Sequence, residues 1–357
     1  MPVEIIGIFH HRDNAEDRPA PPGAFGLQFL TELFQAHDRN GYDRILIANA
    51  ATSPDSIPFA AYAAAVTKNL GFMIAHRPGF VTATMAARML TTIDRLSQGR
   101  CAVHIITGAN DKELQADGDF LTKVDRYVRS GEYVDVLRQM WKAETPFDHE
   151  GEYYRYKGAF SVLKPERPTG IPVYWAGTTP ESIRQAARVA DVYAMSIDSV
   201  AQNGATIEKV RAEAAQHGRK LGYCISFRII LGETEEEAWK KADDLLQRII
   251  PHLKPDIASS VMSNMARRQE MIAGDDVLDE RLWIGITKAT LGTKAVSALV
   301  GTPDQVVDAM MKYYDVGITS FLFYGFDHGR DQDVFGRTVI PLLRQRVAER
   351  EAQAPKA

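Results

Sequence analysis

The chain lacks any apolar run close to the roughly 18 residues that a membrane-crossing helix needs. It also lacks a long basic run. In total, 42 lysines and arginines stand against 46 aspartates and glutamates, for a net charge of −4. We therefore expect neither membrane insertion nor electrostatic binding of nucleic acid. The start, Met1-Pro2-Val3-Glu4, shows neither the basic region nor the cleavage site of a secretory signal.

The chain is also poor in cysteine and in motifs of protein-borne catalysis. Cys101 and Cys224 both lie in apolar runs, which is typical of buried free thiols and, without a signal sequence, predicts a cytoplasmic protein. No H-E-x-x-H or C-x-x-C spacing occurs, so we expect no metal, and no G-x-S-x-G nucleophile turn occurs either. An enzyme without such groups often takes its reactivity from a cofactor.

What the chain does contain is eight short apolar runs separated by helical patterns. Their mostly continuous apolar residues are typical of strands buried on both faces of a parallel sheet. The runs are Glu4–Phe9, Arg44–Ala48, Leu70–Ala75, Cys101–Gly108, Val173–Gly177, Asp191–Ile197, Tyr223–Leu231 and Ser320–Phe326. Eight strand–helix repeats predict an α/β fold, a TIM (β/α)8 barrel, as one domain over residues 1–357. A doubly wound open sheet is the alternative, but its G-x-G-x-x-G turn is missing after the first strand.

Periodicity and capping residues place the helices between these runs. The expected helices cover residues 26–40, 58–69, 82–97, 123–142, 180–189 and 203–217, with others opening at Thr234, at Thr302-Pro303-Asp304 and near Pro341. We expect the last helix to end near Arg350, before a flexible tail over residues 351–357.

Two segments are too long to be simple connections. Gly108–Lys123 follows the fourth strand, and an insertion over residues 251–302 separates the seventh strand from the eighth. Barrel enzymes build their active sites from such loops, and long loops there often act as lids. The second insertion contains Arg281 and Lys288, which could face an anion.

Polar side chains follow the predicted strands where each strand ends, so in a barrel they would converge at one edge. They are His10, His11, Asn49, Thr52, Ser53, His76, Arg77, His104, Thr107, Thr178, Thr179, Ser182, Ser196, Ser226, Arg228, Tyr324, Asp327 and His328. The segment Gly177–Ser182 joins a glycine turn to a helix start, which favours a phosphate. An ordinary threonine cap is the alternative there. Arg77 and Arg228 adjoin apolar strands and need either a bound anion or an internal carboxylate.

Several motifs carry a family resemblance. Ala86–Leu114, AARMLTTIDRLSQGRCAVHIITGANDKEL, resembles the flavin-dependent monooxygenases of the bacterial-luciferase-like family. Asp125-Arg126-Tyr127 is similar to that family's E-R-Y element, and Pro172–Thr179 to its phosphate-binding P-x-[YF]-x-G-G-S-S. Arg211–Trp239 resembles a segment of alkanesulfonate monooxygenases, and residues 298–303 resemble the L-V-G-[TD]-P turn.

The resemblance implies a barrel that binds reduced FMN (FMNH2), supplied by a separate NAD(P)H-dependent FMN reductase. Oxygen adds to the reduced flavin and the peroxyflavin attacks the substrate, which in alkanesulfonate monooxygenases yields an aldehyde and sulfite. A homodimer or homotetramer is also implied, and alanine-rich Phe59–Val66 and Ala83–Leu90 suit close helix packing. The positions that match the family's flavin site are His11, Thr107, Tyr127, Gly177, Thr178 and Thr179.

The substrate side departs from the alkanesulfonate pattern. Ser53 replaces a cysteine, Ser226-Phe227-Arg228 replaces R-x-H and Phe326 replaces a tyrosine, while His328 is retained. The residues predicted to take part in catalysis are Arg228, His328, Ser53 and His11, and those predicted to bind substrate are Arg77, Arg228 and Lys288.

These residues favour oxygenation of a small anionic organosulfur compound of sulfonate type. Because the substrate side is changed, a sulfone or a carbon–nitrogen substrate stays open. A deazaflavin-dependent hydride-transfer enzyme on the same barrel, and a flavin-binding protein without activity, are further alternatives.

Overall fold

The computed structural model describes residues 3–12, 26–108, 110–252, 265–327 and 329–353. It divides into two compact units. The central unit consists of residues 44–194 and 209–222, and the terminal unit consists of residues 1–43, 195–208 and 223–357. Among the described helices, none is both long and apolar enough to span a bilayer.

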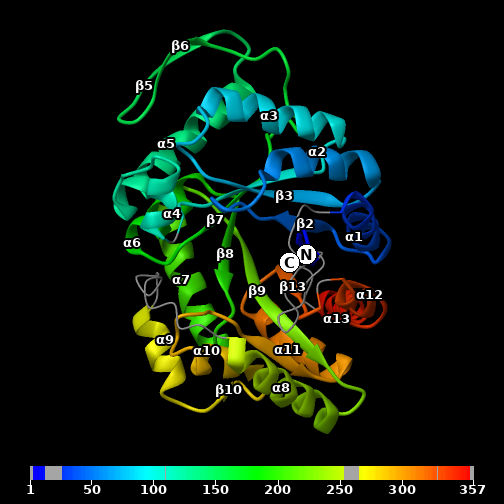
Figure 1. Ribbon diagram of the computed structural model, residues 1–357. Helices are drawn as coiled ribbons and strands as arrows, with labels where there is room; N and C mark the ends of the chain where they lie inside the picture. Colours follow the sequence, from blue (N-terminus) through cyan, green and yellow to red (C-terminus); the bar gives the residue numbers. More distant parts are fainter. Residues whose placement is uncertain (1–2, 13–25, 109, 253–264, 328, 354–357) are drawn as a thin grey trace. The chain divides into compact units, whose positions relative to one another are not determined.

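The central unit alternates strands and helices (Figure 1). Its strands are β2 (Arg44–Ile47), β3 (Gly71–His76), β4 (Cys101–Ile105), β5 (Phe147–Glu150), β6 (Arg155–Ala159) and β7 (Val173–Ala176), with most of β8 (Val192–Ser196). Its helices are α2 (Ser56–Val66), α3 (Ala83–Leu96), α4 (Asp111–Ala116), α5 (Lys123–Lys142) and α6 (Pro180–Val189). The helix α7 (Val200–Gln216) contributes to both units.

The terminal unit holds both ends of the described chain. Its strands are β1 (Glu4–Ile8), β9 (Gly222–Leu231), β10 (Val277–Leu278), β11 (Leu282–Trp283), β12 (Ala298–Gly301) and β13 (Ser320–Tyr324). Its helices are α1 (Leu27–Arg39), α8 (Glu235–Ile249), α9 (Met265–Ile272), α10 (Gly285–Ala289), α11 (Pro303–Asp315), α12 (Asp331–Arg337) and α13 (Val339–Gln353), with a 3-10 turn, η1 (Ile250–His252).

Parallel pairing runs through the strands in the order β1-β2-β3-β4-β7-β8, and β9 pairs with both β8 and β13, which pairs with β1. These eight strands therefore form the closed (β/α)8 barrel that the repeats predicted. Every residue of β3 and of β4 is buried, which explains their continuous apolar sequences. Because parallel strands end at one edge, the loops after them carry the candidate functional residues.

The helix predictions at 123–142 and 180–189 are confirmed without shift. The last helix, predicted to start near Pro341, begins two residues earlier at Val339, and only Thr338 separates α12 from α13. Pro341 then falls in the first turn of α13, where a missing N–H costs no helical hydrogen bond. At Thr302 the predicted helix opening is a full capping box, in which Gln305 bonds back to the Thr302 backbone N–H.

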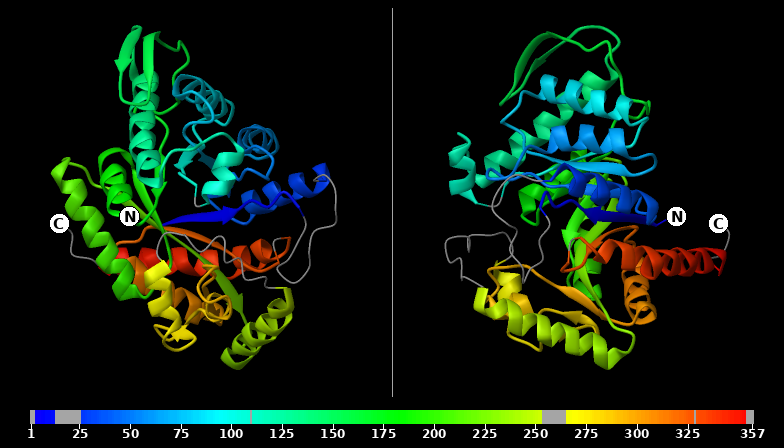
Figure 2. Two further views of the ribbon diagram at one scale, coloured as in Figure 1. Left: turned by 60° about the vertical axis from the view of Figure 1, so that its left-hand side comes forward. Right: turned by 45° about the vertical axis from the view of Figure 1, so that its right-hand side comes forward.

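The β5–β6 hairpin was not predicted. In Figures 1 and 2 it stands at the edge of the central unit beyond α5. Its four-residue alternation of half-buried and exposed side chains is a weak signal by itself. The hairpin is fixed by a long-range contact, since the Glu132 carboxylate on α5 accepts the backbone N–H groups of Tyr153 at 2.9 Å and Tyr154 at 2.8 Å.

Three histidines are buried, and burial lowers the pKa of each to about 4. On α1, His37 Nδ1 lies 2.8 Å from the Leu33 carbonyl oxygen, and at the end of β3 His76 Nε2 lies 2.7 Å from the Tyr133 hydroxyl. The third is His104 on β4. All three are therefore neutral at pH 7 and act as packed structural groups.

Lowering the pH from 7 to 5 is expected to destabilise the protein through these histidines. Unfolded histidines take up protons near pH 6.5, so between pH 7 and 5 the unfolded state binds more protons than the folded state. The free energy of unfolding therefore decreases as the pH is lowered. Each histidine contributes a loss of about 2 kcal/mol at pH 5. In urea unfolding, His37→Gln should shrink the pH dependence by that amount, and His217→Gln, at an exposed position, should not. An unchanged pH dependence in His37→Gln would refute this account.

Candidate functional site

The turn after β7 is built around Gly177. Its φ is +133°, and a Cβ there would lie 2.3 Å from Ser182 Oγ and 2.5 Å from the Tyr127 hydroxyl oxygen. The Tyr193 hydroxyl donates a hydrogen bond to the Gly177 carbonyl. Side-chain hydroxyls thus close on the backbone of this turn, and only glycine fits between them.

The helix α6 begins directly after this turn with Thr179 as its N-cap. Thr179 Oγ1 accepts the Ser182 N–H at 3.2 Å, so the threonine cap is present as the alternative reading had it. Ser182 is fully buried, accepts from Trp175 Nε1 at 3.0 Å and donates to the Ala176 carbonyl at 3.3 Å. The cap uses a lone pair of Thr179, and its hydroxyl proton can still donate to an anion. Thr178 is half-buried beside it.

Arg126, on α5, holds the segment that follows β4. Its Nε donates to the Thr107 carbonyl at 3.0 Å and its Nη1 to the Leu121 carbonyl at 2.6 Å, and Nη2 pairs with Asp111 at 2.8 Å. Arg126 therefore anchors both ends of the predicted insertion after the fourth strand. The next residue, Tyr127, is buried, with its ring centroid 6.3 Å from that of Trp175.

Arg77, after β3, is buried and paired within the central unit. Its Nη2 lies 3.1 Å from Glu113 and its Nη1 3.6 Å from Asp117, both from the α4 segment, and its Nε donates to Asn49 at 2.9 Å. Glu113 also accepts the Ala51 N–H at 2.8 Å. These contacts correspond to the internal carboxylate pair. Ser53 lies half-buried two residues beyond Ala51, in the turn after β2.

Arg228, in the terminal unit, is compensated differently. It lies on β9 opposite Tyr324, the last residue of β13, and is only 9% exposed. Its guanidinium carbon is 4.6 Å from the centre of the Tyr324 ring and 4.6 Å from that of Phe326, and Nη1 donates to the Gly325 carbonyl at 3.3 Å. Contact with two aromatic rings favours a planar cation at this position.

The remaining predicted residues are dispersed. His11 follows β1 and is half-buried, and burial together with Arg12 lowers its pKa. On α10, Lys288 pairs with Asp276 and donates to the Gly274 carbonyl. Arg281, from the same insertion, pairs with Glu235 at 2.9 Å. His328 lies outside the described residues.

Two contributors were not predicted. Tyr193 is a buried strand residue, and the need of a buried hydroxyl for a partner was the signal that could have found it. Asp331, at the start of α12, had no signal, because its role depends on a loop that the sequence does not mark. Within the described part of the chain, no three histidine, cysteine, aspartate or glutamate side chains gather as metal ligands.

Comparisons with known proteins identify the family and support the fold. Residues 5–320 match the family model described as luciferase-like monooxygenase. Among solved structures, riboflavin lyase RcaE superposes with a TM-score of 0.79 at 18% identity, over 97% of this chain and 92% of that chain. EDTA monooxygenase EmoA from Chelativorans sp. BNC1 gives 0.76 at 18% identity, over 97% and 95%. An F420-dependent secondary alcohol dehydrogenase gives 0.68 at 17% identity, over 96% and 99%. Similarity at these identities shows the fold alone.

Gly177→Ala is expected to destabilise the protein by about 1–3 kcal/mol, because the new Cβ combines a strained φ with two close hydroxyls. Gly218→Ala is the matched control, since its φ is also positive, at +65°, but nothing lies within 4 Å of the added Cβ. Urea unfolding of both variants separates the two costs. Equal losses would show that the hydroxyls around Gly177 yield freely, contrary to this description.

Proposed function

Because the chain belongs to the luciferase-like monooxygenase family, whose model matches residues 5–320, we propose that it uses reduced FMN and O2 to oxygenate a small anionic organosulfur compound. The substrate is of sulfonate type, and cleavage of its C–S bond releases sulfite and an aldehyde. Reduced FMN supplies two electrons, one oxygen atom of O2 enters the organic product and the other leaves as water. The remaining chemistry falls to the residues of this chain.

The turn before α6 supports binding of the FMN phosphate. Thr179 caps the helix start, the hydroxyls of Ser182 and Tyr127 lie against Gly177, and Thr178 adjoins them in the chain; a phosphate prefers such donors together with the positive end of a helix dipole. The close approach of hydroxyls at Gly177 fits an anion cradle rather than a packed apolar turn. Titration with NAD(P)H-free reduced FMN and with a reduced deazaflavin distinguishes the two cofactors.

Arg228 is the observation that carries the substrate proposal. A guanidinium removed from water at the level where β13 ends suits recognition of a sulfonate through charge-assisted, in-plane hydrogen bonds. Arg77 supports it less, because Glu113 and Asp117 already lie against its guanidinium. Ser53, His11, His328 and Lys288 stay predicted contributors to the reaction.

The proposed partners are an NAD(P)H-dependent FMN reductase and further copies of this chain. The helix α2 is apolar on its outward side as well, with Pro58 and Ala65 exposed. On the neighbouring α3, Met85 is 43% and Leu96 63% exposed. Apolar outer faces of this kind suit a homodimer or homotetramer.

Reconstitution with a flavin reductase, NADH and O2 is expected to release sulfite from short alkanesulfonates. Arg228→Met should raise KM about 10- to 100-fold, because it removes charge-assisted hydrogen bonds to the anion. Lys312→Met, which removes an exposed charge of the same unit, is the control. Release of product from a sulfone but not from any sulfonate would favour the sulfone alternative. Hydride transfer from reduced deazaflavin without O2 would contradict the monooxygenase proposal.

Ala61→Arg, on the outward side of α2, is expected to lower the oligomeric state in sedimentation experiments, since a charge there disrupts an apolar contact. Ala212→Arg, at an exposed position of α7, should leave it unchanged. A wild-type protein that sediments as a monomer would refute the oligomer.

A further inference from the structure

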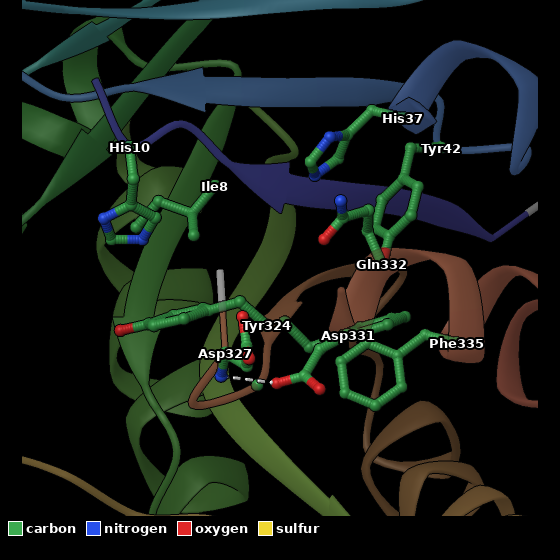
Figure 3. Close-up of a pocket in the computed structure, with 11 residues that line it drawn as sticks. Ile8, His10, His37, Tyr42, Tyr324, Asp327, Asp331, Gln332 and Phe335 are labelled. Atoms are coloured by element: carbon green, nitrogen blue, oxygen red, sulfur yellow. Dashed lines mark hydrogen bonds between the residues drawn. The ribbon is translucent and has the colours of Figure 1, made fainter. Parts of the chain in front are cut away.

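The loop after β13 is wrapped around one carboxylate. Asp331, the first residue of α12, accepts the Asp327 backbone N–H on Oδ2 at 2.8 Å (Figure 3). A Cβ on Gly325 would lie 1.8 Å from the same oxygen and 2.7 Å from Asp331 Cβ. The backbone at Gly325 therefore passes so close to the carboxylate that no side chain fits between them.

The same loop holds Arg228. Tyr324 and Phe326 place their rings on the guanidinium, and the Gly325 carbonyl between them accepts its Nη1 proton. Three consecutive residues thus contact Arg228, and Asp331 approaches the backbone at Gly325 and bonds to the N–H of Asp327. A movement of the loop moves all three contacts together.

Electrostatics agree with this arrangement. Burial raises the pKa of the Asp331 carboxyl, and the nearby Asp327 adds to that rise. Backbone hydrogen bonds from Asp327 and Phe326, with the charge of Arg228, lower the pKa and oppose it. The Asp331 carboxylate and the Arg228 guanidinium therefore lie close enough to interact electrostatically.

We infer that Asp331 is a positioning residue: its carboxylate fixes the loop over residues 324–327 and, through it, the plane in which Arg228 presents its donors. The inference rests on the proposed role of Arg228 toward a substrate anion. With the Tyr324 and Phe326 rings against its guanidinium, Arg228 would bind an oxyanion through its in-plane N–H groups, so the arrangement favours substrates whose sulfonate or carboxylate oxygens reach that plane.

Two substitutions disturb this contact from opposite sides. Asp331→Ala removes the carboxylate, and Gly325→Ala adds a Cβ that the carboxylate must leave. Asp331→Asn keeps one acceptor oxygen for the loop. The matched control is Asp333→Asn in the same turn of α12, since Asp333 contacts Arg39 and Asn40 instead.

Binding of 1-butanesulfonate to the full-length protein, measured by calorimetry, is the first readout. Asp331→Ala and Gly325→Ala should each weaken it about 5- to 20-fold, and the double variant should be weaker by less than the product, because both act on one contact. Asp331→Asn should recover most of the affinity, and Asp333→Asn should stay within about twofold. The Kd for reduced FMN should not change, and in turnover the loss should appear in KM rather than kcat.

The second readout is the crystal structure of Asp331→Ala, which tests the inference even without turnover. Arg228 should move away from the rings of Tyr324 and Phe326 and lose its bond to the Gly325 carbonyl. An Arg228 that stays in place overturns the inference, as does unchanged sulfonate binding in both single variants. If Arg228→Met itself binds the sulfonate normally, the proposed function is at fault, and the position of Arg228 in that crystal structure decides on Asp331 separately.

Discussion

A buried guanidinium must be compensated where it lies, and Arg228 shows what that requirement produces. Burial would be costly for an uncompensated cation, and the contacts around Arg228 include the rings of Tyr324 and Phe326 and the Gly325 carbonyl. The loop after β13 contacts Arg228, and the start of α12 contacts that loop. Asp331 lies against the backbone at Gly325 and accepts the Asp327 N–H.

Other buried or half-buried arginines are paired with carboxylates, and these pairs hold the insertions. Arg77 and Arg126 take Glu113 and Asp111 from the α4 segment, and Arg281 pairs with Glu235 across the second insertion. Breaking such a pair would leave the arginine without its carboxylate partner. The pairs therefore stabilise long segments that form few β-sheet hydrogen bonds of their own.

The barrel could be predicted because eight continuous apolar runs need a sheet covered on both faces, and the runs at Gly71–His76 and Cys101–Ile105 are buried throughout. The positions of Gly177 and Thr179 could be predicted because a glycine shortly before a capping threonine indicates a turn that leads into a helix start. The β5–β6 hairpin and Asp331 could not, since each depends on a contact between residues whose pairing no local pattern encodes. Arg77 illustrates the same gap, because its partners come from a segment about 36 residues away along the chain.

The account centres on oxygen transfer from O2 to a sulfonate bound at Arg228. A single turnover of the protein loaded with reduced FMN, under 18O2 and with 1-butanesulfonate, tests this most directly by mass spectrometry. One labelled oxygen atom per molecule of product is the expected result, and Arg228→Met should form less of this product at low sulfonate concentration. Product formed without label, or formed equally well in the absence of O2, would contradict the account.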